Sequence, residues 1–181
     1  MSFTTSQYFK GSIKLASATT NGEYSSDFDS AIVDIEKQIL IDLLGYDLYS
    51  KFIAGLAEQN PLQKWLDLRD GKEYETQDAD GRTVKVKWSG FQNAEYISCL
   101  AYFIYYEWQV NNYSQNSTTG ENKATAQNSE RASMSDYNRK LVYAYNKGVD
   151  LYGLDIESIG GINVILRSPR YQEELLNKNK I

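Results

Sequence analysis

Apolar residues recur every three or four positions along most of this chain between residues 26 and 152, which is the spacing of helices that bury one face. Glycines and prolines interrupt the pattern and divide it into segments of helical length. One short segment instead alternates with a period of two, as a strand does. The pattern therefore predicts a mainly α fold: a helical bundle of four to five helices with an inserted β-hairpin and extended terminal arms.

Three helices are predicted before residue 72. The first begins with a capping box of Ser26 and Asp29 and stops at Gly45. Its apolar stripe consists of Ile32, Ile35, Ile39, Leu40, Leu43 and Leu44. The second runs from Asp47 to about residue 60, and a short third helix follows Pro61. The first two helices are expected to pack against each other as a helical hairpin.

The segment with the two-residue period is predicted to form the inserted β-hairpin with a partner strand around residue 74. Val84 and Val86 alternate with Lys85 and Lys87, after an Asp-Ala-Asp-Gly turn. With Arg82, these lysines form a basic stretch beside aromatic residues, which is one way to bind nucleic acid. Outward lysines also keep a hairpin from pairing edge to edge with other strands, and this interpretation is favoured.

Two more helices are predicted after the hairpin. Helical spacing returns over residues 91–108, which are so apolar on every face that this helix is expected in the middle of the fold. A last long helix is predicted over residues 134–152. The polar stretch between them, residues 111–132, is long for a connection in a compact domain. It is expected to be functional or disordered.

The chain of 181 residues has the length of one domain. Its ends contain too few apolar residues for a core of their own. We therefore expect an N-terminal arm over residues 1–25, a helical domain over residues 26–153 and a C-terminal arm over residues 154–181.

The residue types that most enzymes use are scarce in this chain. It has no histidine and a single cysteine, Cys99. This excludes the commonest general base, the commonest transition-metal ligand and any internal disulfide. Cys99 lies in the most apolar helix and is expected to be an inert core residue. Acidic residues gather over residues 67–80, but their spacing departs from that of a calcium loop, and a solvated surface explains them better. We expect no catalytic residue, no metal and no cofactor.

Charge and tyrosine content point to protein partners. The net charge of −5 disfavours general binding to nucleic-acid phosphates or anionic lipid. Fifteen tyrosines are an unusual number, and tyrosine is favoured where protein surfaces meet. Tyr8, Tyr24, Tyr113 and Tyr171 lie in predicted arms and loops, where burial needs a partner. This group predicts assembly.

A membrane location is not expected. The most apolar stretch, residues 96–106, is shorter than the ~20 residues that a spanning helix needs. The first residues lack the basic and apolar regions of a secretory signal. A cytoplasmic protein is therefore predicted.

Several short segments follow one another in a distinctive order between about residues 30 and 152. They are Ile-Leu-Ile-Asp-Leu-Leu-Gly-Tyr-Asp-Leu-Tyr (39–49), Phe-Ile-Ala-Gly-Leu (52–56), Lys-Trp-Leu-Asp-Leu (64–68), Trp-Ser-Gly-Phe (88–91), Tyr-Phe-Ile-Tyr-Tyr-Glu (102–107), Thr-Gly (119–120), Asn-Ser (128–129) and Ala-Tyr-Asn (144–146). In this order the chain resembles the head–tail connector, or adaptor, proteins of tailed bacteriophages. The resemblance is greatest to those of phages and prophages of Bacteroidetes-type hosts, and it leaves out both ends of the chain.

The resemblance implies a structural virion protein without a catalytic site or cofactor. Such proteins assemble as a homo-oligomeric ring, commonly twelvefold, beneath the portal protein, and they join it to downstream neck or tail proteins. DNA passes through the ring without sequence-specific binding. The expected location is the virion neck, and the host cytoplasm before assembly. Residues 26–153 would be the connector domain.

The resemblance also suggests which residues contact neighbouring subunits, portal or tail. The candidates are Tyr8, Tyr113, Thr119, Gly120, Asn128, Arg167, Arg170 and Tyr171. An alternative function is a DNA-packaging accessory protein that binds duplex DNA through the basic hairpin residues Arg82, Lys85 and Lys87. An enzyme built on carboxylates alone is a third, less favoured reading.

Overall fold

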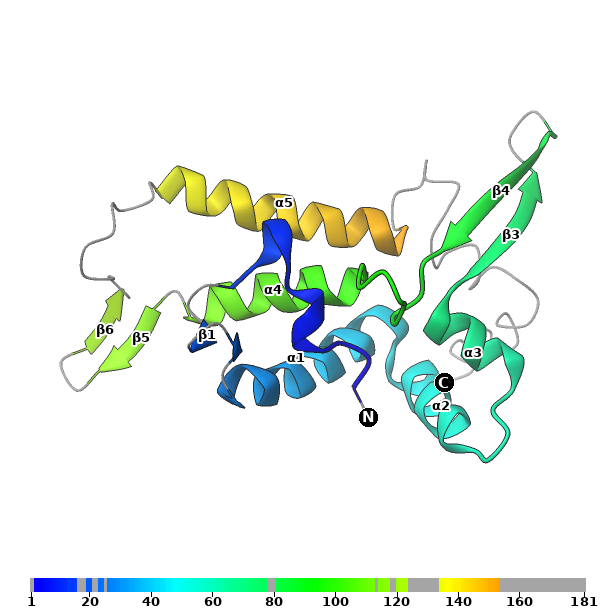
Figure 1. The fold of residues 1–181 in the computed structure, drawn as a ribbon, viewed down its shortest axis with the longest axis horizontal. Helices are drawn as coiled ribbons and strands as arrows, with labels where there is room; N and C mark the ends of the chain where they lie inside the picture. The colour runs from blue at the N-terminus through cyan, green and yellow to red at the C-terminus, as the bar shows by residue number, and fades with distance from the viewer. Residues whose placement is uncertain are drawn as a thin grey trace, which may run out of the picture.

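The computed structural model describes residues 2–15, 19–20, 23–24, 26–77, 81–112, 114–117, 120–123 and 134–153. Over this part of the chain it contains five α-helices and three two-stranded antiparallel hairpins (Figure 1). In chain order these are β1 (Thr19–Thr20), β2 (Glu23–Tyr24), α1 (Ser26–Leu44), α2 (Tyr46–Ala57), α3 (Gln63–Asp70), β3 (Lys72–Gln77), β4 (Thr83–Trp88), α4 (Cys99–Asn112), β5 (Ser114–Ser117), β6 (Gly120–Lys123) and α5 (Met134–Tyr152). The prediction of a mainly α fold with an inserted hairpin is confirmed.

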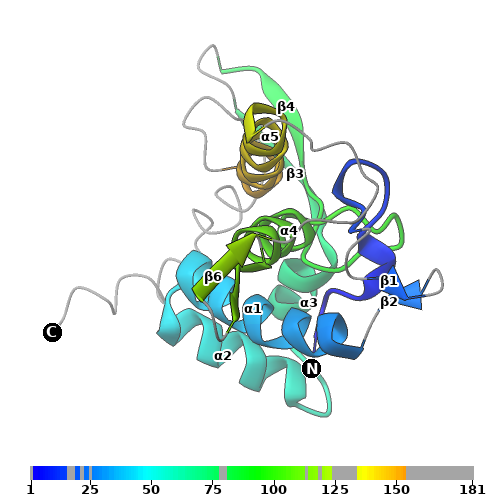
Figure 2. The same cartoon turned by 90° about the vertical axis from the view of Figure 1, so that its left-hand side faces the viewer.

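Helix α4 is the middle of the bundle. It packs against α1 and α5, and Figure 2 shows α4 between them. The contact with α5 is close, because Gly148 lies against the ring of Phe103. The buried residues of α4 are Cys99, Leu100, Ala101, Phe103, Ile104 and Tyr105. The expectation that the most apolar helix is central is confirmed, since such a helix must be covered on every side.

Glycines end α1, as predicted, and also α3. Gly45 has a φ of 75° and donates its N–H to the Ile41 carbonyl at 2.8 Å. Gly71 has a φ of 89° and donates to the Asp67 carbonyl at 3.0 Å. Glycine adopts such positive φ values without the steric cost that other residues meet. Helix α2 ends at Ala57, earlier than the predicted end near residue 60.

The predicted hairpin is present as β3 and β4. The register pairs Lys72 with Trp88 and Tyr74 with Val86. Trp88, at the base of the hairpin, is buried, and its indole N–H donates to the Leu68 carbonyl at 2.9 Å. This bond ties the hairpin to α3, while the rest of β3 and β4 projects from the helical body (Figure 1).

The start of the central helix differs from the prediction. Residues 91–98 form a loop, and α4 begins only at Cys99. The Asn93 side-chain amide donates to the Ser89 carbonyl at 3.1 Å, and its oxygen accepts the Ile97 N–H at 3.1 Å. An asparagine that bonds nearby backbone in this way offers the chain an alternative to the helix. Among the apolar residues of this loop, Phe91 is buried, whereas Ala94, Tyr96 and Ile97 are exposed, so the apolar spacing here did not mark a buried helix face.

The prediction of an extended N-terminal arm over residues 1–25 is wrong for residues 2–15. This N-terminal segment contains two short 3₁₀ turns, η1 (Ser6–Tyr8) and η2 (Gly11–Ile13), and joins the core of the helical body. Phe3 stacks on Phe52 of α2, with ring centroids 5.5 Å apart. The buried residues are Phe3, Thr4, Tyr8, Phe9, Ile13 and Leu15. Each such aromatic or aliphatic side chain gains about 1.5–3 kcal/mol on burial, which favours docking over an extended arm.

Candidate functional site

Glu36 of α1 holds the N-terminal segment to the helical body. Its carboxylate accepts the backbone N–H groups of Phe3 at 2.9 Å and Thr4 at 2.7 Å, and the Ser2 hydroxyl at 3.2 Å. Only 2% of Glu36 is exposed. Burial raises the pKa of this carboxyl above its usual range, although the hydrogen bonds from the segment oppose the rise. One buried carboxyl group therefore sets where the segment docks.

Glu36 is not among the residues predicted from the sequence pattern, although the pattern contains a signal for it. Glu36 lies on the apolar face of α1, one turn after Ile32 and one turn before Leu40, and both of these neighbours are buried. A carboxylate on a buried face needs hydrogen-bond donors. These donors could not be predicted, because they are the backbone N–H groups of Phe3 and Thr4, which lie in no helix or strand.

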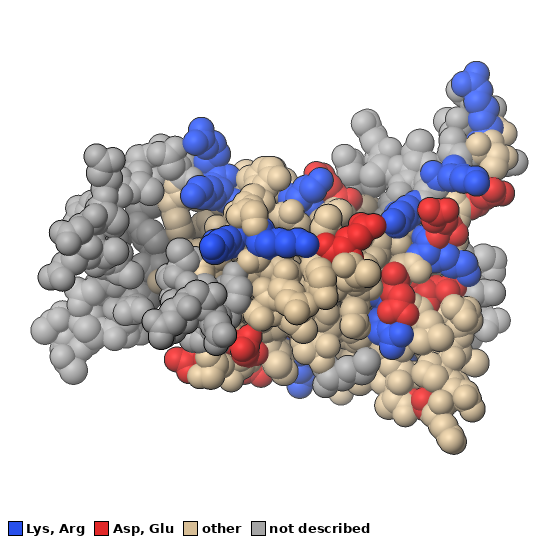
Figure 3. All heavy atoms as spheres, in the orientation of Figure 1, with Lys and Arg blue, Asp and Glu red and all other residues tan. Residues whose placement is uncertain are grey.

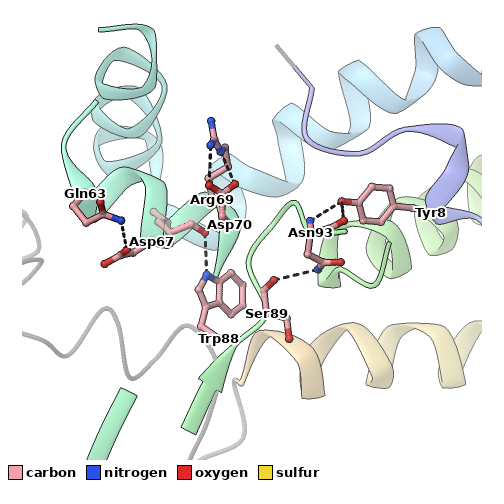
Figure 4. Close-up of polar contacts among 9 residues, drawn as sticks. Tyr8, Gln63, Asp67, Arg69, Asp70, Trp88, Ser89 and Asn93 are labelled. Atoms are coloured by element: carbon pink, nitrogen blue, oxygen red, sulfur yellow. Dashed lines mark hydrogen bonds and ion pairs between the residues drawn. The ribbon is translucent and has the colours of Figure 1, made fainter. Parts of the chain in front are cut away.

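A groove with a volume of about 710 Å³ lies beside the N-terminal segment. Its walls come from that segment, from the C-terminal end of α3 and from the loop before α4, as Figure 4 shows. The Tyr8 hydroxyl accepts the Asn93 backbone N–H at 2.9 Å and donates to the Asn93 carbonyl at 3.3 Å. Arg69 binds the Asp70 carboxylate at 2.6 and 2.7 Å. The Tyr8–Asn93 bonds join two walls of the groove, whereas the Arg69–Asp70 pair lies within one wall.

Tyr8 does not need a partner subunit for its burial, and this part of the prediction is wrong. Only 2% of Tyr8 is exposed in the single chain. Its ring meets that of Tyr96 edge to face, with centroids 5.3 Å apart, and burial raises the pKa of its hydroxyl. Tyr96 itself has a φ of 56°, uncommon for a residue other than glycine. The N-terminal segment and the loop before α4 thus fix each other.

Most of the other predicted contact residues lie outside the described residues. These are Tyr113, Thr119, Asn128, Arg167, Arg170 and Tyr171. Gly120 is described in its backbone, where it opens β6 and pairs with Ser117 of β5. Part of the predicted polar connection over residues 111–132 therefore forms a hairpin at the end of α4.

Two of the three basic residues of the hairpin, Lys85 and Lys87, are paired with glutamates on the neighbouring strand. Arg82, Lys85 and Lys87 are all exposed. Lys85 is paired in register with Glu75, and Lys87 with Glu73. Opposite charges at paired positions attract each other and lower the positive potential that a DNA phosphate would meet. This arrangement agrees better with a soluble, non-pairing hairpin edge than with a DNA-binding surface.

Asp67, one of the acidic residues near the hairpin, makes hydrogen bonds within its own part of the fold. Asp67 is buried, which corrects the expectation of a solvated surface at this position. It accepts hydrogen bonds from Lys72 at 2.7 Å and from Gln63 at 2.8 Å. Within the described ranges, no three Cys, Asp or Glu side chains come close enough to hold a metal ion.

Cys99 is expected to resist thiol reagents in the folded protein. It is fully enclosed at the start of α4, and burial raises the pKa of its thiol to about 12. The thiolate is the reactive form, so at pH 8 almost none of it is available. A colorimetric disulfide reagent should therefore label Cys99 only at the rate of unfolding. Rapid stoichiometric labelling without denaturant would contradict this burial, and labelling in urea is the positive control.

The comparisons with known proteins leave the family resemblance as a hypothesis. No protein-family model, no curated protein sequence and no solved structure matches this chain. None of the described helices is both long enough and apolar enough to cross a membrane.

Proposed function

We propose that this chain is a structural virion protein, a subunit of the head–tail connector or neck ring that joins the portal to the tail and extends the DNA channel. The order of segments between residues 30 and 152 supports this family. In the structure, the observation that carries the proposal is that three large side chains of α5, Val142, Tyr143 and Tyr145, remain exposed to solvent on different sides of the helix. Exposed residues of this kind are typical of surfaces that meet protein partners.

The shape of the described chain also suits lateral assembly. The β3–β4 hairpin projects at one end of the long axis, and β5–β6 lies at the other end (Figure 1). Elements that extend beyond a small helical body give neighbouring subunits more contact area than the body alone. The N-terminal segment does not belong to this surface, since its apolar residues are buried in their own subunit.

The proposed mechanism is mechanical. A contact between two different faces of the same subunit closes into a ring when each step rotates by a fraction of a full turn. A net charge of −5 suits a channel through which DNA slides, because a basic lining would retain the phosphates. The ring would form in the host cytoplasm at the portal and remain in the virion neck.

The test is binding to the portal protein encoded in the same genome. Purified chain is mixed with assembled portal and examined by size-exclusion chromatography and negative-stain electron microscopy. We expect co-elution and an added ring of density on one end of the portal. A portal from an unrelated phage is the control and should remain bare. A chain that never binds its own portal would contradict the proposal.

A DNA-binding measurement on the same purified protein distinguishes the connector from the alternative function. A DNA-packaging accessory that uses Arg82, Lys85 and Lys87 must bind duplex DNA with a steep loss of affinity as salt rises. Fluorescence anisotropy with a labelled duplex at low and high salt measures this directly. Salt-dependent binding that is lost on replacing the three basic residues by glutamine would favour the alternative over the connector.

A further inference from the structure

Helix α5 has an outward face with one aromatic side chain among three cations. Tyr143 is 52% exposed. Arg139 and Lys140 lie one helical turn before it, and Lys147 lies one turn after it. The opposite face of α5 packs on α4, where Ala144 and Gly148 are buried. We name the four residues Arg139, Lys140, Tyr143 and Lys147 the Tyr143 face.

A groove of opposite character lies between α1 and α4. It has a volume of about 350 Å³ and is lined by Asp34, Ile35, Gln38, Ile39, Asp42, Glu107 and Asn111. Ile35 and Ile39 form its apolar part, and Asp34, Asp42 and Glu107 supply three carboxylates. The Gln38 side-chain amide donates to Asp42 at 2.9 Å, which fixes one side of the groove. We name this the acidic groove.

The two surfaces complement each other in charge and in polarity. An aromatic ring flanked by cations matches an apolar floor flanked by carboxylates, and tyrosine is enriched at the centres of protein interfaces. Figure 3 shows Lys and Arg over α5 along the upper edge of the molecule. The whole chain has a net charge of −5, so the Tyr143 face has the opposite charge to the chain as a whole.

The two surfaces cannot meet within one chain. Helix α4 separates α1 from α5 (Figure 2), and Tyr143 is exposed on a different side of α5 from the buried Ala144 and Gly148. We propose that the Tyr143 face of one copy docks in the acidic groove of a second copy. This inference rests on the proposed function, for which it identifies the contact between neighbouring subunits. Because the two surfaces differ, the contact is head to tail, and its repetition gives a ring or a filament.

Charge reversal tests this contact without touching the core. One variant combines Lys140→Glu with Lys147→Glu, and a second combines Asp34→Lys with Asp42→Lys. Each is expected to raise the concentration needed for self-association at least tenfold, measured by analytical ultracentrifugation at low salt. Lys14→Glu with Lys51→Glu is the matched control for the first variant, because it makes the same charge change at exposed positions outside both surfaces and outside the hairpins. The control should associate like the wild type, and circular dichroism checks that every variant is folded.

Mixing the two variants is the decisive measurement. Each variant alone has two surfaces of like charge, but the reversed face of one fits the reversed groove of the other. An equimolar mixture should therefore regain association, in alternating copies, and lose it again at high salt. Unchanged association of both variants, a mixture that stays dissociated, or a wild type that never self-associates would overturn the inference. Self-association without portal binding would instead contradict only the proposed function.

Discussion

Replacing Gly90 by alanine is expected to lower the free energy of unfolding by about 2–5 kcal/mol. Gly90 has a φ of 80°, and a Cβ there would overlap the backbone of Arg69, Asp70 and Gly71. Backbone atoms at the end of α3 cannot move aside as a flexible side chain can, since the neighbouring Gln92 N–H is bonded to the Arg69 carbonyl at 2.9 Å. The loss is measured by urea denaturation followed by tryptophan fluorescence.

Gly81→Ala is the matched control for this variant. Gly81 has a similar φ of 76°, but apart from its two chain neighbours no described residue has an atom within 4 Å of the position that a Cβ would take. It should therefore show only the backbone cost of a positive φ, about 1–2 kcal/mol. If Gly90→Ala costs no more than Gly81→Ala, the close approach between the base of the hairpin and α3 is not a stabilising feature of the fold.

Replacing Glu36 by alanine is expected to cost about 2–4 kcal/mol and to release the N-terminal segment. The substitution leaves the buried N–H groups of Phe3 and Thr4 without an acceptor, and relief of the buried carboxylate offsets part of that cost. Hydrogen exchange at these two amides and urea denaturation together measure the effect. Lys37→Ala, at the exposed neighbouring position, should change neither. Full protection of both amides in Glu36→Ala would contradict the anchoring role.

The same residue gives a pH dependence with a defined sign. Because burial raises the pKa of Glu36 in the folded state above its ordinary value of 4.5, the folded chain binds this proton more tightly than the unfolded chain. The stability contributed by this proton is fully present below about pH 4.5 and is lost as the pH rises through the folded pKa. Glu36→Gln removes this titration. The stability difference between wild type and Glu36→Gln should therefore shift against the wild type as pH rises, and a constant difference would contradict the raised pKa.

Local pattern was enough to predict the regular elements of this protein. The extent of α5 agrees with the predicted range, and α1 begins at Ser26 and stops before Gly45 as expected. The pairing of β4 with the strand around Tyr74 also agrees. These features follow from the period of the apolar residues and from the backbone freedom of glycine, which act over a few neighbouring residues.

Contacts between distant parts of the chain could not be predicted in this way. The N-terminal segment has few apolar residues and no period, so its docking depends on Phe52, which lies far along the chain, and on the buried carboxyl of Glu36. The same holds for the pairing of Tyr8 with Asn93 and for the facing of Gly90 and Gly71. The period of the apolar residues identifies which face of a helix is buried. It does not identify which other part of the chain packs against that face, because that depends on the tertiary structure. The helices of this protein can therefore be predicted from its sequence. The docking of the N-terminal segment and the formation of the Tyr143 face and the acidic groove depend on how the helices pack in the folded chain.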